Sequence, residues 1–247
     1  FSNNAFGYKS LTSNTTGRNN TASGTESLNS NTTGSDNTAS GAYSLGTNTT
    51  GSFNTAYGYQ SLKFNTTGND NTAFGYNSLS FNTTGSNNTA YGQQSLLYNT
   101  TGIYNTASGA YSLGANTTGS NNTAYGIYSL LSNTTGSNNT AFGYSAKAST
   151  GNATNQTVIG HEATGQADNS VVLGNDNVTA VYMGEDSGAT VYAGGLNLGG
   201  TAITANAAEL NYLDGVTSSI QTQLDNAGGG ASTLNDLTDV LVDSNSM

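Results

Sequence analysis

The 247-residue chain carries a formal net charge of −10 and contains neither cysteine nor proline. Without cysteine it has no disulfide framework and no thiolate metal site, and its acidic, lysine-poor composition disfavours binding to nucleic acid. Only 7% of its residues are charged, whereas disordered chains with few apolar residues are usually highly charged. We therefore expect order through regular backbone pairing, which prolines would interrupt, and no insertion into a membrane, since no long apolar run occurs.

A unit of seventeen residues repeats through the first part of the chain. Residues 71–85, for example, read Asn-Thr-Ala-Phe-Gly-Tyr-Asn-Ser-Leu-Ser-Phe-Asn-Thr-Thr-Gly. Asn-Thr-Ala-x-Gly and Ser-Leu-x-x favour extended strands, and Asn-Thr-Thr-Gly favours a turn in which the glycine takes a positive φ. Each copy is predicted to form one coil of an all-β, parallel β-solenoid with two short strands and two turns per coil. The glycine of the Ala-x-Gly step marks the repeat at Gly7, Gly24, Gly41, Gly58, Gly75, Gly92, Gly109, Gly126 and Gly143.

Alternation along the strand separates an inner face from an outer face. It places Ala73 and Gly75 on one side and Thr72 and Phe74 on the other. Small residues inside imply a thin roll, whose remaining interior Leu79 and its equivalents are expected to fill. Because apolar stripes are rarely left exposed on soluble proteins, the outer aromatic residues are candidates for the axis of a homotrimer. These residues are Phe6, Tyr57, Phe74, Tyr91, Tyr125 and Phe142.

A second group of aromatic residues follows the Ala-x-Gly step at the first corner of the coil. It includes Tyr59, Tyr76 and Tyr144. Aromatic rings at such a position are able to stack on the sugars of a host surface glycan. The alternative, that these rings only cover the rim of the roll, remains equally open from the sequence.

The repeat resembles a known family. Asn-Thr-Ala-Phe-Gly, followed by Ser-Leu and Asn-Thr-Thr-Gly, is similar to the YadA-like head repeat of trimeric adhesins, which forms a left-handed parallel β-roll. That family repeats every fourteen residues, a spacing that occurs here only between Gly160 and Gly174. The resemblance implies that residues 1–175 form a left-handed roll in a homotrimer, with an enlarged corner in the longer repeats.

Two segments further along resemble the tail fibres of marine bacteriophages, namely residues 177–184 and 201–216. The resemblance implies a short β-prism-like section over residues 176–203, in which Val178 to Met183 and Ala189 to Ala193 are expected to be strands. Residues 204–227 are predicted to form a short trimeric helical collar, because Asn206 and Glu209 have the spacing of a capping box and the leucines that follow fit a coiled-coil pattern. Residues 228–247 are expected to be a glycine hinge and the start of a further element.

Few residues suggest chemistry. His161 is the only histidine, and its sequence surroundings suggest a turn rather than a catalytic or metal-binding group. The adjacent Glu185 and Asp186 lie between glycines and read as an exposed turn. The sequence therefore predicts no catalytic, metal or cofactor site and no enzymatic activity.

The two resemblances together imply a structural fibre protein of a virion. The chain is expected to be part of a phage tail fibre outside the cell, to mediate host attachment, and to contact its own copies, other fibre or baseplate proteins and host surface glycans. The alternative is the head domain of a bacterial trimeric autotransporter adhesin. A signal peptide and a membrane-anchoring β-barrel in the full reading frame would distinguish the adhesin.

Overall fold

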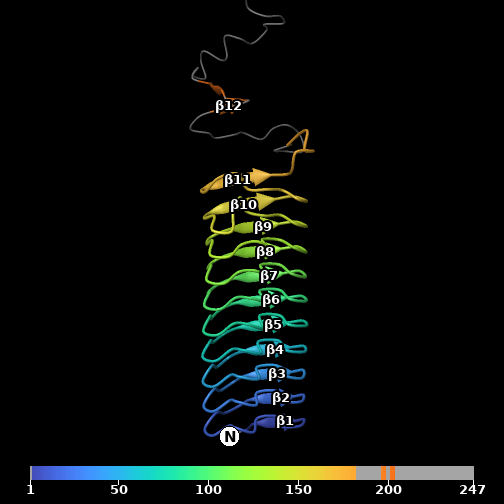
Figure 1. The fold of residues 1–247 in the computed structure, drawn as a ribbon, viewed down its shortest axis with the longest axis vertical. Coiled ribbons are helices and arrows are strands. Elements are labelled where there is room, and N and C mark those ends of the chain that lie inside the picture. Colours follow the sequence, from blue (N-terminus) through green and yellow to red (C-terminus); the bar gives the residue numbers. More distant parts are fainter. Residues whose placement is uncertain (1, 182–195, 199–200, 204–247) are drawn as a thin grey trace, which may run out of the picture. The chain divides into compact units, whose positions relative to one another are not determined.

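The computed structural model describes residues 2–181, 196–198 and 201–203. The chain separates into two compact units, Phe1–Val181 and Tyr182–Met247. In the first unit eleven short strands form one parallel sheet in chain order, so each coil lies directly on the one before (Figure 1). No helix occurs in the described part of the chain. The prediction of an all-β parallel β-solenoid is therefore confirmed.

Each coil contributes one strand, of three residues in the long repeats and four in the last two coils. The strands are β1 (Asn4–Phe6), β2 (Thr21–Ser23), β3 (Thr38–Ser40), β4 (Thr55–Tyr57), β5 (Thr72–Phe74), β6 (Thr89–Tyr91), β7 (Thr106–Ser108), β8 (Thr123–Tyr125), β9 (Thr140–Phe142), β10 (Gln156–Ile159) and β11 (Ser170–Leu173).

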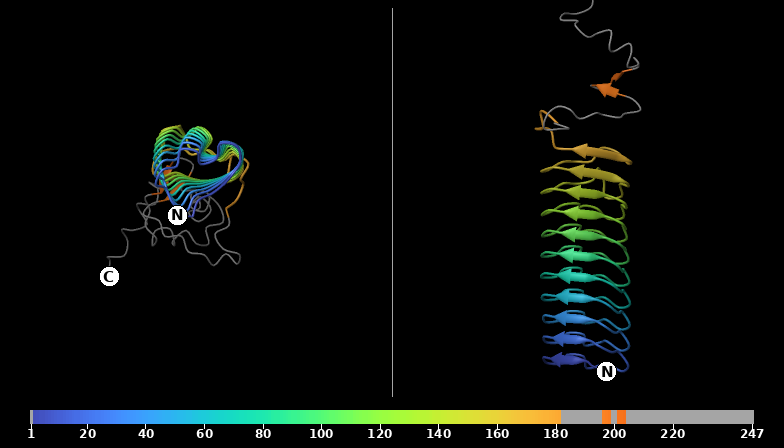
Figure 2. Two further views of the ribbon diagram at one scale, coloured as in Figure 1. Left: turned by 90° about the horizontal axis from the view of Figure 1, so that it is seen from below. Right: turned by 180° about the vertical axis from the view of Figure 1, so that it is seen from behind.

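The register of the sheet follows the sequence repeat. Ala56 lies opposite Ala73, seventeen residues away, and the same offset holds from β1 to β10. Between β10 and β11 the offset shortens to fourteen, with Val158 opposite Val172. Seen along its long axis, the first unit shows its coils superposed (Figure 2). The predicted period is therefore the period of the coil.

The interior is as narrow as the sequence predicts. Ala73 of β5 and Leu79 of the following turn are completely buried, as are their equivalents in the neighbouring coils. Thr72 and Phe74 lie on the opposite side of the strand and are partly exposed. Each coil from β2 to β8 therefore adds one alanine and one leucine to a single continuous core, and the coils of β9 and β10 continue it with Ala141, Ala146, Val158 and Ala163.

Two columns of buried asparagines complete the interior, and the sequence analysis did not foresee them. Asn82, from the Asn-Thr-Thr-Gly corner, donates from Nδ2 to Asn65 Oδ1 at 2.7 Å and to the Gly85 carbonyl at 2.8 Å. Asn71, before β5, donates to Asn54 Oδ1 at 3.1 Å and accepts a bond from the backbone amide of Asn88 at 3.0 Å. These columns satisfy buried backbone groups that no strand pairs.

The prediction of a second strand per coil is wrong. The Ser-Leu segment turns instead of extending, because Leu79 takes the left-handed conformation with φ 51°, as do its equivalents. This conformation is uncommon for leucine, and it directs the side chain into the core. The backbone still pairs between coils, with the Leu79 amide donating to the Ser95 carbonyl at 2.9 Å.

The reason for the glycine in Asn-Thr-Thr-Gly also differs from the prediction. Gly85 has no positive φ; a Cβ there would collide with Asn82 Oδ1 and the Gly102 carbonyl, so glycine is required by the space. The positive φ, 132°, belongs to Gly75 of the Ala-x-Gly step, where a Cβ would lie 2.6 Å from the carbonyl oxygen of Gly92.

The last coils close differently from the others. Asp168 takes the place of serines such as Ser120 and Ser137, whose hydroxyls accept a hydrogen bond from an amide of the preceding coil, and its Oδ1 accepts a hydrogen bond from the Thr154 amide at 2.8 Å. That bond holds the pKa of the exposed Asp168 carboxyl below its ordinary value. Residues 178–181 form no strand, so the strand expected over Val178 to Met183 is absent from its four described residues.

In the second unit, β12 (Leu196–Leu198) and β13 (Thr201–Ile203) pair antiparallel, with Leu196 opposite Ile203. The other elements expected there, including the strand over Ala189 to Ala193, the helical collar over residues 204–227 and the hinge over 228–247, lie outside the described residues.

Candidate functional site

The outer face of the sheet carries the aromatic stripe that the sequence predicts. Each of its members is the last residue of a strand and points away from the core, so that the exposed fraction of Tyr91 reaches 62%. Rings in consecutive coils stack, with centroids 5.2 Å apart between Tyr57 and Phe74 and 4.9 Å apart between Tyr125 and Phe142. The structure places all six predicted residues on this face, namely Phe6, Tyr57, Phe74, Tyr91, Tyr125 and Phe142.

The stripe has gaps and an extension. Serines occupy the same position in β2, β3 and β7, so the aromatic residues form separate groups rather than one row. The extension was missed by the sequence analysis: Ile159 and Leu173 continue the register of Phe142 and are also exposed. The signal that could have located both is the glycine that directly follows each of them, Gly160 and Gly174.

The corner tyrosines fall into two separate ladders. In the first, Tyr59 and Tyr76 stack with ring centroids 5.6 Å apart, and Tyr43 meets Tyr59 edge-on at 5.9 Å. Tyr144 does not join them; it belongs to a second ladder together with Tyr111, Tyr128 and His161. In that ladder neighbouring ring centroids are separated by 5.2 to 6.0 Å.

A third aromatic column lies two residues after the core leucine, and the sequence analysis did not single it out. Phe64, Phe81 and Tyr98 stack at 5.1 and 5.4 Å between ring centroids. The ammonium of Lys63 lies 4.9 Å from the ring centroid of Phe64 and 5.5 Å from that of Tyr43, and so connects this column with the first tyrosine ladder. The column ends at Tyr98, because the next coil has Ala115 at the equivalent position.

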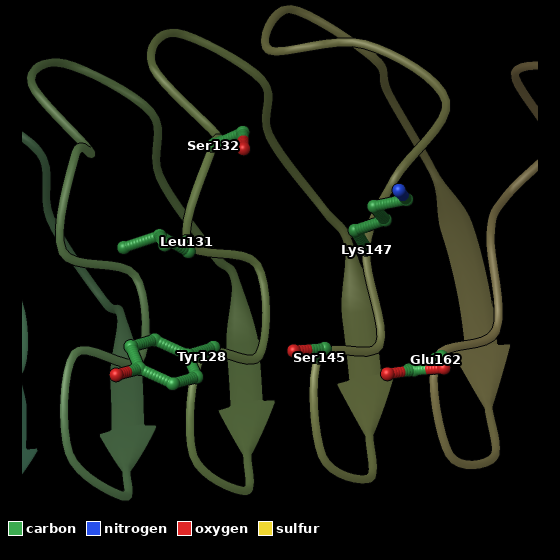
Figure 3. A pocket seen from close by; sticks show the side chains of 6 residues that line it. All are labelled: Tyr128, Leu131, Ser132, Ser145, Lys147 and Glu162. Carbon is green, nitrogen blue, oxygen red and sulfur yellow. The ribbon is translucent and has the colours of Figure 1, made fainter.

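Beyond that end the surface is hollowed. A groove of about 580 Å³ runs along the turns that follow β8, β9 and β10, and its six labelled side chains come from these successive coils (Figure 3). A smaller hollow of about 230 Å³ is lined by Tyr98, Tyr111 and Ala115 and shares Leu131 with the groove. The groove itself is lined by Tyr128, Leu131, Ser132, Ser145, Lys147 and Glu162.

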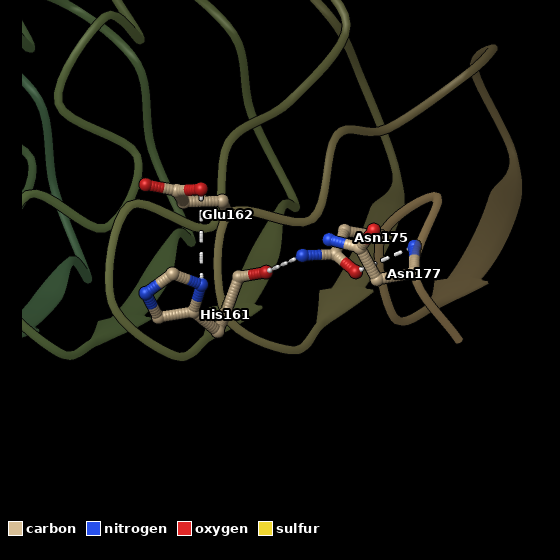
Figure 4. A network of polar contacts seen from close by, with 4 residues as sticks. All are labelled: His161, Glu162, Asn175 and Asn177. Atoms are coloured by element: carbon tan, nitrogen blue, oxygen red, sulfur yellow. Dashed lines mark hydrogen bonds and ion pairs between the residues drawn. The ribbon is translucent and has the colours of Figure 1, made fainter.

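His161 lies at the end of the second tyrosine ladder, in a turn. Its Nδ1 is 3.8 Å from Glu162 Oε2, and both side chains are largely exposed. Its carbonyl accepts a hydrogen bond from Asn175 Nδ2 at 2.9 Å, and Asn175 Oδ1 in turn accepts one from the Asn177 amide (Figure 4). These bonds fix the turn without bringing a nucleophile to the imidazole.

Within residues 2–181, 196–198 and 201–203 no three His, Cys, Asp or Glu side chains gather as metal ligands would. Glu185 and Asp186 lie outside the described residues. No helix able to cross a membrane was found in the part of the chain that the structure covers.

The comparisons with known proteins add no relative. No protein-family model matches the chain, and neither a curated protein nor a solved structure matches it.

Proposed function

We propose that this chain is a structural section of a virion fibre of the phage tail-fibre type, which mediates attachment to a host cell. The observation that supports this most is the uninterrupted stack of eleven strands, in which every coil repeats the backbone pairing of the one before. Such a stack is a rod whose length grows by about 4.8 Å per coil. A rod of this kind is suited to hold an attachment surface away from the particle, outside the cell, rather than to catalyse a reaction.

The proposed assembly is a homotrimer of left-handed rolls. The interior of one roll is very thin, with one leucine and one alanine per coil from β2 to β8, so a single chain buries little apolar surface. The stacked rings on the outer strand face would supply the buried apolar surface that the interior lacks, since a threefold axis would cover the stripes of all three chains at once. The β-prism-like section and the helical collar belong to the same proposal, and they would continue the threefold symmetry into residues 176–227.

One observation favours the head of a bacterial trimeric adhesin as the second candidate. The offset of fourteen residues between β10 and β11 is the spacing of the YadA-like head repeat. The full reading frame separates the two candidates, because an adhesin requires a secretion signal and a membrane-anchoring β-barrel, whereas a fibre requires an end that attaches to the virion.

Immunogold labelling tests the function directly. An antibody against residues 2–181 is applied to virus particles and to cells from the culture that expresses the gene. The proposal predicts gold along fibres of the virion, whereas label confined to the bacterial surface would support the adhesin and label on neither would contradict both.

Light scattering tests the trimer with a variant that the repeat itself supplies. Serine already occupies the stripe position in three strands, so replacing Tyr57, Phe74 and Tyr91 together by serine should preserve the coil. The proposal predicts a trimeric mass for the original protein and dissociation of the variant at micromolar concentration. As the control, Tyr59→Ala at the corner, where Ala42 is the natural equivalent, should remain trimeric.

A further inference from the structure

The groove over the turns after β8, β9 and β10 has no part in the proposed shaft or in the proposed trimer interface. Its volume of about 580 Å³ lies within the usual range of ligand sites, about 300 to 1,000 Å³. It is formed by the turns that follow the strands (Figure 3), and its lining residues are not those of the outer strand stripe. A partner that contacts only the stripe would therefore leave these side chains accessible.

The groove exists because one position of the coil changes from bulky to small side chains. In the coils before it, Phe64, Phe81 and Tyr98 fill the position two residues after the core leucine. The next two coils carry Ala115 and Ser132 there. The stack of rings is thus replaced by a trough, with Tyr98 at one end.

One wall of the trough is aromatic. Tyr111 and Tyr128 stack with ring centroids 5.4 Å apart. Tyr128 lines the groove and Tyr111 lines the smaller hollow, and Leu131 lines both. The exposed fraction of Tyr128 is 37%, so part of its ring remains accessible. Aromatic rings of this kind give sugars a surface on which to pack their apolar faces.

The far end of the groove is polar and carries a cation. Lys147 is the only lysine or arginine after Lys63 in the sequence. Its exposed ammonium makes no ion pair with any acid in the described part of the chain. Among the described residues, the hydroxyls of Ser132 and Ser145 likewise make no hydrogen bond, and the Glu162 carboxylate adds acceptors.

We propose that this groove binds an acidic oligosaccharide, in which a carboxylate of one sugar pairs with Lys147. The neighbouring sugars pack against Tyr128 and Tyr111, and their hydroxyls donate to Glu162 and to the two serines. This inference rests on the proposed role in attachment and gives that role a ligand class. It also moves glycan contact from Tyr59 and Tyr76 of the first ladder to the second ladder.

The surrounding charge restricts the ligand further. The chain has a net charge of −10, and Glu162 lines the same groove as its single cation, Lys147. A densely charged polymer such as a sulfated glycan would meet repulsion that one lysine does not offset. A glycan with isolated carboxylates among neutral sugars fits this distribution of charge.

Binding is measured by saturation-transfer NMR and titration on the full chain in its native assembly. The probes are sialyllactose, hyaluronan octasaccharide, carboxyl-reduced hyaluronan, malto-octaose and heparin fragments. We expect saturable binding of at least one carboxylate probe with a dissociation constant below about 1 mM, and weaker binding of the carboxyl-reduced and sulfated forms. Absence of saturable binding by both carboxylate probes overturns the proposal, as does equal or tighter binding of the carboxyl-reduced or sulfated forms.

Two matched pairs of variants locate the site. Lys147→Gln should weaken binding about tenfold or more, the usual loss when a charged hydrogen bond is removed, whereas Lys63→Gln makes the same change of charge outside the groove and should leave binding unchanged. Tyr128→Ala should weaken binding, whereas Tyr59→Ala in the first ladder should not. Equal effects within either pair would place binding elsewhere and overturn the assignment.

Filling the groove provides a test that does not depend on removing a contact. Ser132→Tyr places a ring inside the groove, at the position that Phe64, Phe81 and Tyr98 fill in earlier coils, and should abolish binding while the far-ultraviolet circular dichroism is unchanged. Retained binding by the folded variant contradicts the proposal. Because immunogold labelling does not depend on sugar binding, a fibre that is labelled but binds no acidic sugar would refute the groove and leave the proposed function standing.

Discussion

The buried asparagine columns provide the sharpest test of what holds the coils together. Replacing Asn71 by alanine removes four hydrogen bonds. Asn71 Nδ2 loses its bonds to Asn54 Oδ1 at 3.1 Å and to the Gly85 carbonyl at 2.9 Å. The Asn88 backbone amide and Asn88 Nδ2 lose Asn71 Oδ1 as their acceptor, at 3.0 and 3.2 Å.

The loss of stability depends on which of the former partners keep another hydrogen bond. The Gly85 carbonyl still accepts from Asn82, and Asn88 Nδ2 still donates to the Gly102 carbonyl. Only the buried Asn88 backbone amide loses its one partner. At about 1 kcal/mol per hydrogen bond, Asn71→Ala should lower the free energy of unfolding by about 4 kcal/mol.

Equilibrium urea unfolding followed by far-ultraviolet circular dichroism measures this change. Thr84→Ala is the control, because Thr84 is exposed in the Asn-Thr-Thr-Gly corner that follows β5. Substitutions at exposed positions usually change the free energy of unfolding by no more than about 0.5 kcal/mol. If Asn71→Ala is no more destabilising than Thr84→Ala, the asparagine columns do not stabilise the coils and the reasoning is refuted.

Three further predictions concern the glycine step, the core and the last coils. Gly75→Ala should prevent stable folding of the central coils, seen as loss of amide protection by hydrogen exchange, because the residue has φ 132° and a Cβ would lie 2.6 Å from the Gly92 carbonyl oxygen; normal protection would contradict this. Leu79→Ala should lower the free energy of unfolding, measured in urea, by about 3 kcal/mol, since the side chain is fully buried; a loss below about 1 kcal/mol would show that the interior collapses around the cavity. The pKa of Asp168 is lowered by the hydrogen bond from the Thr154 amide, so its stabilising contribution is present above the ordinary pKa of an aspartate and is lost as pH falls through the lowered value; exchange of the Thr154 amide should accelerate over that range more than in Asp168→Asn, and equal behaviour would exclude the carboxylate as the cause.

The repeat made the coil predictable because a strict period leaves few ways to stack identical units. Alternation around Ala73 correctly gave the inner and outer faces, and it located the outer aromatic stripe. These features depend on local pattern alone. The role that we propose for the stripe, an interface with other copies of the chain, concerns a contact that the sequence of one chain does not display.

The turn segments could not be predicted because their conformation is decided by packing. Nothing in Ser-Leu indicates that Leu79 takes a left-handed conformation, and its preference for extended structure is overridden by burial of the side chain. The asparagines suggested turns, as isolated asparagines do. Their inward columns arise only when each amide meets its copy in the coil above.

The groove was missed for a different reason. A sequence search looks for residues that are present, whereas the trough results from rings that are absent at Ala115 and Ser132. Lys147 and Glu162 are fifteen positions apart and belong to different coils. Only the stacking brings them to one hollow.

Distances between spin labels test the central claim most directly. The chain has no cysteine, so single cysteines can be introduced at exposed, equivalent corner positions, Thr16 paired in turn with Thr101, Thr118 and Thr135. Stacked coils predict distances that grow linearly, at about 24, 29 and 34 Å for pairs five, six and seven coils apart. Because the proposed trimer would add distances between chains, labelled protein is diluted with unlabelled protein. Distances that do not increase with the number of intervening repeats would contradict the solenoid.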